Sequence, residues 1–154
     1  MNKFILDTNI VLAYFQNNEK VINEIESIFP LFTDENITAI SIVTVGELYS
    51  LALQRQWGQV KLNKITELIR ELIVVDINAD DIIDKYAIID AYSQGKLYNE
   101  PLPIGMSSRN MGKNDLWIAA TTQATKSTLI TTDDDFKHLK DKFINLFFID
   151  LSNI

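Results

Sequence analysis

The sequence predicts an α/β fold in which a mostly parallel sheet is flanked by helices on both faces. Short apolar runs alternate along the chain with longer segments whose apolar residues recur at helical spacing. Strands that are separated by helices need crossover connections, and such connections make neighbouring strands parallel. Most of the predicted strands are also uninterrupted apolar runs, which is typical of a sheet that is covered on both faces.

The first half of the chain alternates between strands and helices from its first residues. The predicted elements are a strand at 3–6, helices at 10–15 and 19–29, a strand at 37–42, a helix through Glu47 to Ala52, a helix at 60–72 and a strand at 73–75. Pro30 closes the second helix, because proline cannot continue a helix. Thr44 stands three residues before Glu47, so we expect it to cap the third helix in a capping box.

The second half continues this pattern after one long interruption. We expect a helix at 79–94, a loop at 95–112, a helix at 115–124, a strand at 128–132, a short helix at 134–139 and a last strand at 146–149. The apolar residues on the expected buried side of the first of these helices are Ile82, Ile83, Tyr86, Ile89 and Ala91. The loop contains three glycines and two prolines, and its length exceeds that of most connections in compact domains, which favours a functional role.

Length and composition limit the kind of protein that this chain can be. A chain of 154 residues is typical of one domain, so we expect a single domain over residues 1–154. The absence of cysteine excludes a disulfide framework, a thiolate metal site and a cysteine nucleophile. The N-terminal apolar run reaches Asp7 too soon to be a signal peptide, and no run is long enough to span a membrane. We therefore expect a cytoplasmic protein.

Four acidic residues stand where a parallel sheet would bring ligand groups together. Open parallel sheets bind ligands beyond the carboxyl ends of their strands. Asp7 and Asp133 each follow a predicted strand. Glu47 and Asp115 stand at the starts of predicted helices. Each acid has a plain structural explanation when taken alone, because acids cap helices, stabilise first helical turns and occur in solvated turns. Their joint order favours a functional interpretation.

Four short motifs carry these acids in a specific order. The motifs are Asp7-Thr8-Asn9 after a strand, Thr44-x-x-Glu47-Leu48, Asn114-Asp115-x-x-Ile118-Ala119-Ala120 and Thr131-x-Asp133-x-Asp135-Phe136. The series resembles the PIN-domain family, and within it the VapC-like toxins of bacterial toxin–antitoxin pairs. The resemblance runs from Asp7 to Phe136 and so covers most of the chain. The loop at 95–112 looks longer than in the shortest family members.

The resemblance implies a PIN-like fold and a metal-dependent endoribonuclease that hydrolyses RNA phosphodiester bonds. The positions that it implies as catalytic metal ligands are Asp7, Glu47, Asp115 and Asp133. It implies supporting polar roles for Asn9 and Thr131. Asp135 matches a family position too, but we interpret it as structural. The resemblance further implies an antitoxin protein as a partner, and a homodimer.

The residue types at the four positions favour a hard cation. Two carboxylates about 4 Å apart repel by roughly 4 kcal/mol at an effective dielectric near 20, so four of them cluster only if protons or cations compensate. Oxygen ligands without cysteine or clustered histidine favour Mg²⁺, with Mn²⁺ as a substitute. Such a metal suits phosphodiester hydrolysis. His138 is the only histidine, and we expect it at the surface because it stands among lysines.

Substrate binding rests on two basic residues near the predicted site. A net charge of -7 argues against a nucleic-acid partner, because phosphate binding normally needs a basic patch. Cations that bind four of the acids would offset part of this charge. Arg109 on the long loop and Lys113 before Asp115 are placed to meet phosphates, and we hypothesise that they bind RNA, although both fit ordinary surface charges equally well.

Two other functions stay open on the sequence. A phosphatase of the haloacid dehalogenase kind also begins with a strand and an aspartate, but it needs a second aspartate two residues on, where this chain has Asn9. A catalytically inactive PIN-like binding module would be expected to lack at least one of the four acids, and all four are present. Asp76 and Asp150 also follow strands, but neither stands in such a motif, so we interpret both as structural.

Overall fold

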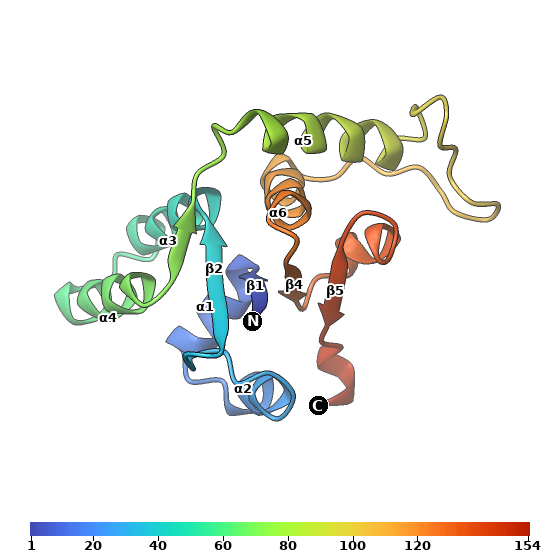
Figure 1. The fold of residues 1–154 in the computed structure, drawn as a ribbon. Coiled ribbons are helices and arrows are strands. Elements are labelled where there is room, and N and C mark those ends of the chain that lie inside the picture. Colours follow the sequence, from blue (N-terminus) through green and yellow to red (C-terminus); the bar gives the residue numbers. More distant parts are fainter.

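Five strands form one sheet in the computed structural model, which describes all 154 residues (Figure 1). The strands are β1 (Asn2–Leu6), β2 (Asn36–Ser41), β3 (Ile73–Val75), β4 (Thr128–Thr131) and β5 (Asn145–Phe148). Their order across the sheet is β3-β2-β1-β4-β5, and every neighbouring pair is parallel. The predicted α/β class is therefore confirmed, and the sheet is parallel throughout.

Helices connect all the strands. They are α1 (Thr8–Phe15), α2 (Glu19–Glu26), α3 (Ile42–Gln54), α4 (Gln59–Arg70), α5 (Asp80–Ser93) and α6 (Lys113–Ala124), with 3₁₀ helices η1 (Asp134–Leu139) and η2 (Leu151–Asn153). Each predicted helix is present. η1 has the predicted bounds, the other predicted helices differ at one or both ends, and η2 was not predicted. None of the helices combines the length and the apolar character that a membrane crossing requires.

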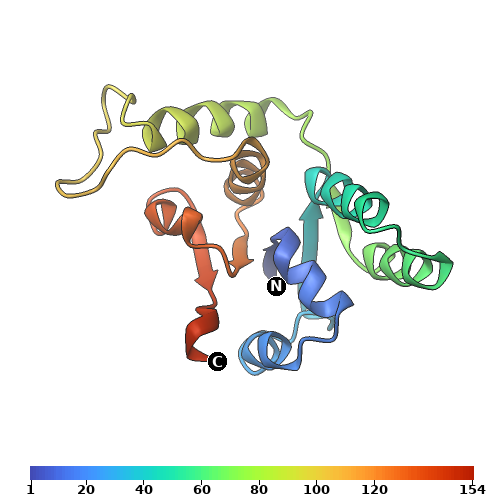
Figure 2. The ribbon, with the colours of Figure 1, turned by 180° about the vertical axis from the view of Figure 1, so that it is seen from behind.

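Alternate residues of the central strand β1 point to opposite faces of the sheet, as strand geometry requires. Phe4 and Leu6 belong to a core of 15 buried residues that α1, α2, α3 and α4 complete. Ile5 belongs to a second core of 13 buried residues, built with α5, α6 and η1. Figures 1 and 2 show these layers from opposite sides, with β2 in front of α1 in the first view and behind it in the second. Both faces of the sheet are thus covered, as predicted.

The start of α3 differs from the prediction. β2 runs directly into α3, and Ser41 is the N-cap residue, with its Oγ accepting a hydrogen bond from the backbone N–H of Val43 at 3.2 Å. Thr44 was predicted to cap this helix, but it lies inside the first turn, and Glu47 consequently lies one turn further along. The spacing of three residues places both side chains on the same side of α3.

The outer helix α5 also departs from the prediction. It packs mainly against α6, and Ile82 and Ile89 are buried there. Ile83 was predicted to be buried but is 47% exposed. A helix that packs against one neighbouring helix, instead of lying on a sheet, buries a narrower stripe of its surface.

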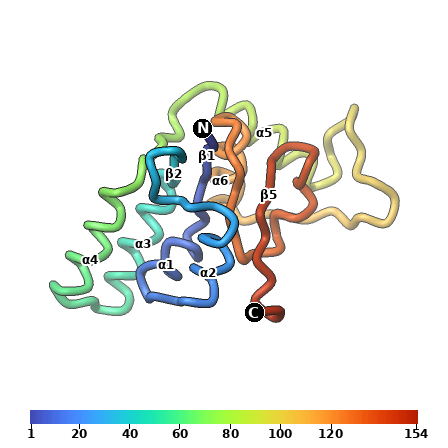
Figure 3. Tube along the Cα trace, turned by 60° about the horizontal axis from the view of Figure 1, so that its bottom comes forward, coloured from blue at the N-terminus to red at the C-terminus, as the bar shows by residue number.

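The predicted loop between α5 and α6 contains no helix or strand. Figures 1 and 3 show that its middle part extends away from the body of the molecule. The loop leaves α5 through Gly95, whose φ of +69° is a conformation that favours glycine. It returns to the body at Arg109, whose backbone N–H donates to the carbonyl of Ser93 at 2.7 Å.

The core on the side of α1 gives a test of the fold. Ile40 of β2 is fully buried, and Ile40→Ala should lower the free energy of unfolding by about 2 to 5 kcal/mol, because the cavity left in a packed core cannot fully close. Leu53→Ala, at a side chain that is 81% exposed, should change it by no more than about 0.5 kcal/mol. Urea unfolding of both variants measures this difference, and similar losses would contradict the described packing.

Candidate functional site

The four predicted acids line one hollow at the carboxyl ends of the central strands. This acidic hollow has a volume of about 680 Å³, and Asp7, Glu47, Asp115 and Asp133 all border it. Asp7 and Asp133 follow the neighbouring strands β1 and β4, while Glu47 lies on α3 and Asp115 in the first turn of α6. Asn9 also borders the hollow, and no lysine or arginine does. The fold therefore brings together residues that are far apart in the sequence.

Asp7 is the most buried of the four acids, with only 4% of its surface exposed. It is the N-cap of α1, and its Oδ1 accepts a hydrogen bond from the backbone N–H of Thr8 at 2.8 Å. Its Oδ2 accepts a hydrogen bond from the hydroxyl of Thr131 at 2.7 Å. Both oxygens are thus fixed, one by the following helix and the other by the neighbouring strand. The capping role and a functional role are compatible at this position.

Thr8 holds Glu47 by a hydrogen bond that the sequence did not predict, and Thr44 lies beside Thr8. The hydroxyl of Thr8 donates to Glu47 Oε1 at 2.9 Å and lies 3.1 Å from the hydroxyl oxygen of Thr44. Thr8 and Thr44 are both buried. A threonine stands near Asp7, Glu47 and Asp133 in the sequence, which was a usable signal, but the contact between α1 and α3 arises only in the folded chain.

Thr131 connects Asp7 to the acids after β4. Its hydroxyl oxygen accepts a hydrogen bond from the backbone N–H of Asp133 at 2.9 Å while it donates to Asp7. Asp133 Oδ1 in turn accepts a hydrogen bond from the backbone N–H of Asp135 at 2.9 Å. These bonds fix the turn that enters η1 and place the hydroxyl of Thr131 between Asp7 and the backbone of Asp133.

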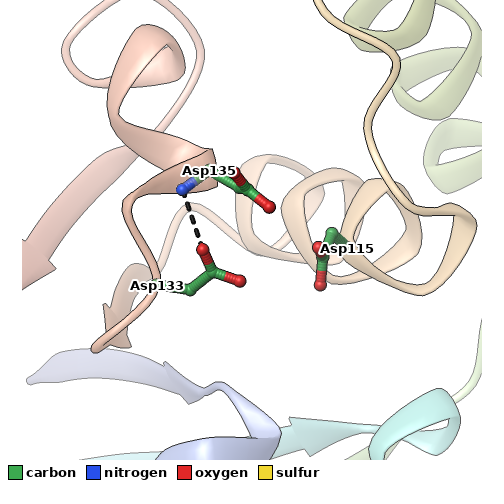
Figure 4. Close-up of side chains that lie close together, drawn as sticks. All are labelled: Asp115, Asp133 and Asp135. Atoms are coloured by element: carbon green, nitrogen blue, oxygen red, sulfur yellow. Dashed lines mark hydrogen bonds between the residues drawn. The ribbon is translucent and has the colours of Figure 1, made fainter.

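The tightest acidic group includes a residue that we interpreted as structural. One carboxylate oxygen from each of Asp115, Asp133 and Asp135 lies within 4.8 Å of the other two. Figure 4 shows the three side chains, with Asp133 and Asp135 on one side and Asp115 on α6 facing them. A purely structural role for Asp135 does not explain why its carboxylate faces the other two. Donor sets of carboxylate oxygens are the ligands that hard divalent cations prefer.

Burial and mutual repulsion disfavour the charged forms of two of these acids. Burial raises the pKa of Asp7 to about 6, with smaller contributions from the charges of Asp133 and Glu47. Burial likewise raises the pKa of Asp115 to about 7, and the charges of the surrounding acids add to the shift. A cation bound among these oxygens would reverse the repulsion. The electrostatics of the site therefore fit a divalent metal.

Arg109 and Lys113, the two basic residues predicted near the site, lie at different places relative to the acidic hollow, and neither borders it. Arg109 borders a separate hollow beside Asp135, and its Nη1 donates to the backbone carbonyl of Asp135 at 3.4 Å. Lys113 is exposed at the start of α6 and does not border the acidic hollow.

Asp76 and Asp150 lie outside the acidic hollow. Asp76 Oδ1 accepts a hydrogen bond from the backbone N–H of Asn78, and Asp150 Oδ1 accepts one from the backbone N–H of Ser152. These local bonds agree with the structural interpretation of both residues.

The prediction that His138 lies at the surface is wrong. Its side chain is buried between η1 and the end of α5, with Nε2 at 2.7 Å from the hydroxyl of buried Ser93. Burial is the main cause that lowers the pKa of His138 to about 4, and the charge of Arg109 adds to it. The flanking lysines suggested exposure, but the end of α5 lies against this side of η1, and Ser93 there contacts the imidazole.

Comparison with known protein families finds one match for this chain. The sequence matches the profile of the PIN domain over residues 4–142. No curated protein matches the sequence significantly.

Several solved structures share the fold. A chain of VapBC2 from Rickettsia felis bound to a promoter DNA fragment has a TM-score of 0.71 at 22% identity, covering 94% of this chain and 97% of that one. A chain of VapBC-1 from nontypeable Haemophilus influenzae has a TM-score of 0.71 at 24% identity, covering 95% and 97%. A chain of FitAcB from Neisseria gonorrhoeae has a TM-score of 0.65 at 21% identity, covering 94% and 96%. At these identities the likeness establishes the shared fold.

The raised pKa of Asp115 predicts the effect of pH on stability in the absence of metal. A carboxyl whose pKa is higher in the folded state contributes stability below the unfolded value of about 3.8 and loses that contribution as the pH rises through the folded value of about 7. With a chelator, Asp115→Asn should therefore raise the Tm at about pH 8 and change it little near pH 4. Hydrogen bonds from Ser152 lower the pKa of Asp150, so Asp150→Asn should give no such gain. Equal gains in both variants would refute this account.

The acidic group predicts which of two adjacent aspartates contributes to metal binding. Asp135→Asn should weaken Mn²⁺ binding by at least roughly tenfold, because removing even an indirect metal contact commonly costs that much. Asp134→Asn removes the same charge from an exposed side chain outside the group and should have a much smaller effect. Calorimetric titration with Mn²⁺ compares the two variants. A smaller loss for Asp135→Asn than for Asp134→Asn would exclude Asp135 from the site.

Proposed function

Because this chain belongs to the PIN domain family, we propose that it is an endoribonuclease that requires Mg²⁺, or Mn²⁺ as a substitute, to hydrolyse RNA phosphodiester bonds. The observation that carries the proposal is the convergence of carboxylates at the carboxyl ends of β1 and β4, with no lysine or arginine in the acidic hollow to compensate them. An acidic group of this kind without a neighbouring cation favours a metal site over a network of salt bridges.

The residues that would hold the metal are Asp7, Glu47, Asp115 and Asp133, together with Asp135, which the geometry adds. When bound, a divalent cation lowers the pKa of a water and stabilises charge on phosphate oxygens. The chain itself supplies orientation. Thr131 fixes Asp7 and the turn at Asp133, and Thr8 fixes Glu47, so the carboxylate oxygens need little rearrangement on binding a cation. Asn9 borders the same hollow and is placed to contact substrate.

RNA is the proposed substrate, and Arg109 and Lys113 are its proposed phosphate contacts. Both precede Asp115 in the chain, and Arg109 also lies against the turn that carries Asp135. Positive side chains at the border of an acidic metal site can position a phosphate that the acids alone would repel. We also propose a cytoplasmic location, where such an enzyme would meet its substrate.

We further propose that the chain is the toxin of a toxin–antitoxin pair and that a partner protein covers its site. The structures that share its fold include VapBC proteins. α3, which borders the acidic hollow, and the following helix α4 expose large apolar side chains, with Leu53 81% exposed and Val60 83% exposed. Exposed apolar groups of this size favour a protein interface. The exposed Ile83 and Ile88 of α5 similarly support the homodimer implied by the family resemblance.

A catalytically inactive binding module remains the second candidate. It would share the fold, but it would not need an acid such as Asp115 to stand among four other carboxylates whose charges repel it. The match to the PIN domain gives no support to a haloacid dehalogenase-type phosphatase.

Cleavage of total RNA by the purified chain tests the proposal. Cleavage should require Mg²⁺ or Mn²⁺, stop on addition of chelator and fall by at least roughly a hundredfold in Asp7→Asn, since loss of one essential group costs several kcal/mol of transition-state stabilisation. Asp76→Asn and Asp150→Asn, which remove the same charge after other strands, should retain most of the activity. Metal-independent cleavage, or full activity in Asp7→Asn, would rule out the proposed site. No cleavage and no metal binding would favour the binding module.

A further inference from the structure

A second polar hollow adjoins the acidic group at Asp135. This loop hollow, with a volume of about 360 Å³, lies between the returning end of the long loop and η1. Ser107, Ser108, Arg109 and Asn110 border it on the loop side, and Asp135 and Lys137 border it on η1. The carboxylate of Asp135 also lies within 4.8 Å of Asp115 and Asp133. The loop hollow therefore begins where the acidic group ends.

The loop hollow carries the positive charges that the acidic hollow lacks. Neither Arg109 nor Lys137 forms a salt bridge, and the only two in the molecule involve other lysines. Arg109 Nη1 donates to the backbone carbonyl of Asp135, and Lys137 Nζ lies 4.0 Å from the centre of the Phe148 ring. Neither cation is paired with a carboxylate at salt-bridge distance, and the charge of Lys137 acts on Asp150 only as a minor contribution to the lowered pKa of that carboxyl, so both cations can still attract an anion.

The wall of the loop hollow is fixed by a buried polar group below it. Ser93, at the end of α5, accepts a hydrogen bond at its carbonyl from the backbone N–H of Arg109 at 2.7 Å. Its hydroxyl contacts His138 Nε2 at 2.7 Å and Met111 Sδ at 3.4 Å. Ser93, Met111 and His138 are all buried. Because Ser93 joins the loop to η1, the two sides of the hollow are held together before any ligand binds, which reduces the entropy lost on binding.

We propose that the loop hollow is a phosphate-binding subsite, which holds the phosphate next to the scissile one in a single-stranded RNA. The inference rests on the proposed nuclease function and adds the path of the substrate, which would run from the acidic group across Asp135 toward the loop. The guanidinium of Arg109 suits two phosphate oxygens at once, and Lys137 adds a point charge. The hydroxyls of Ser107 and Ser108 and the amide of Asn110 supply neutral donors.

The opposing carboxylates do not cancel this attraction. Asp135 would be compensated by the cation of the acidic group. Asp134 is the other carboxylate at the border of the hollow, and it is exposed, so Arg109 and Lys137 meet one bordering negative charge besides that of Asp150, which lies outside the hollow. Single-stranded nucleic acids are commonly held by a positive groove that follows the backbone without reading the bases. The subsite would therefore favour a backbone position and show little preference for sequence.

Binding of a fluorescently labelled, mixed-sequence RNA of about ten nucleotides tests the subsite, with Ca²⁺ in place of Mg²⁺ to slow turnover. Arg109→Gln with Lys137→Gln should weaken binding about tenfold and reduce the slope of log affinity against log salt by about 0.7, the value for one phosphate contact on a single strand. Lys3→Gln with Lys126→Gln removes the same charge near the amino ends of the central strands β1 and β4, away from both hollows, and should change neither quantity. Arg109→Lys keeps the charge and should retain the salt slope.

The outcomes separate the subsite from the nuclease itself. Equal weakening by both double variants, or no weakening by either, would overturn the subsite. The single variant Lys137→Gln controls for misfolding of the double variant, because Lys137 is exposed and its Nζ contacts only the Phe148 ring, so this change should leave the fold intact. It should show a partial loss of affinity. Mg²⁺-dependent cleavage with an unchanged KM in the Arg109 and Lys137 double variant would reject the subsite and leave the nuclease. Binding that depends on these two residues without any cleavage would reject the nuclease and leave the subsite.

Discussion

Buried Asp7, which follows β1, joins that strand to α1 and β4. Its carboxylate caps α1 and accepts a hydrogen bond from Thr131 at the end of β4, and its backbone N–H donates to the carbonyl of Ile130 in the same strand. A carboxylate in this setting is stabilised by its hydrogen bonds but opposed by its burial, and burial has the larger effect on its pKa. The arrangement thus holds an acid in place without fully stabilising its charge, which is the condition in which a cation would bind most favourably.

Acidic and basic side chains near Asp7 lie in two separate hollows, one suited to a metal ion and the other to a phosphate. The acids lie together in a hollow without lysine or arginine, while Arg109 and Lys137 lie beyond Asp135 in a second hollow. Placing the cations inside the acidic group would form salt bridges and reduce its affinity for a metal. Because Arg109 and Lys137 lie beyond Asp135, they form no salt bridge with the acids, and the negative and the positive group each keep their charge for a ligand. A chain with a net charge of -7 can in this way present a local positive site to a phosphate.

The order and kind of the elements were predictable from the sequence because the apolar pattern is clear in each of them. The misses share one cause, which is that tertiary neighbours override local patterns. Thr44 has the right spacing for a cap, but β2 continues to Ser41 and moves the start of α3. Ile83 follows the apolar period of α5, but this helix packs mainly on α6. His138 stands among lysines, but η1 turns it inward against Ser93.

The sequence by itself determined the α/β class and the mostly parallel sheet, and it singled out four acids as candidates, since each of these depends on local pattern and short spacing. The tertiary structure alone decided which polar groups meet. Thr8 reaches Glu47 across 39 residues, and Thr131 reaches Asp7 across 124. It also brought Asp135 to face Asp115 and placed Arg109 beside η1. Contacts of this kind depend on how helices and strands pack, and no local pattern encodes the packing of residues so distant in the chain.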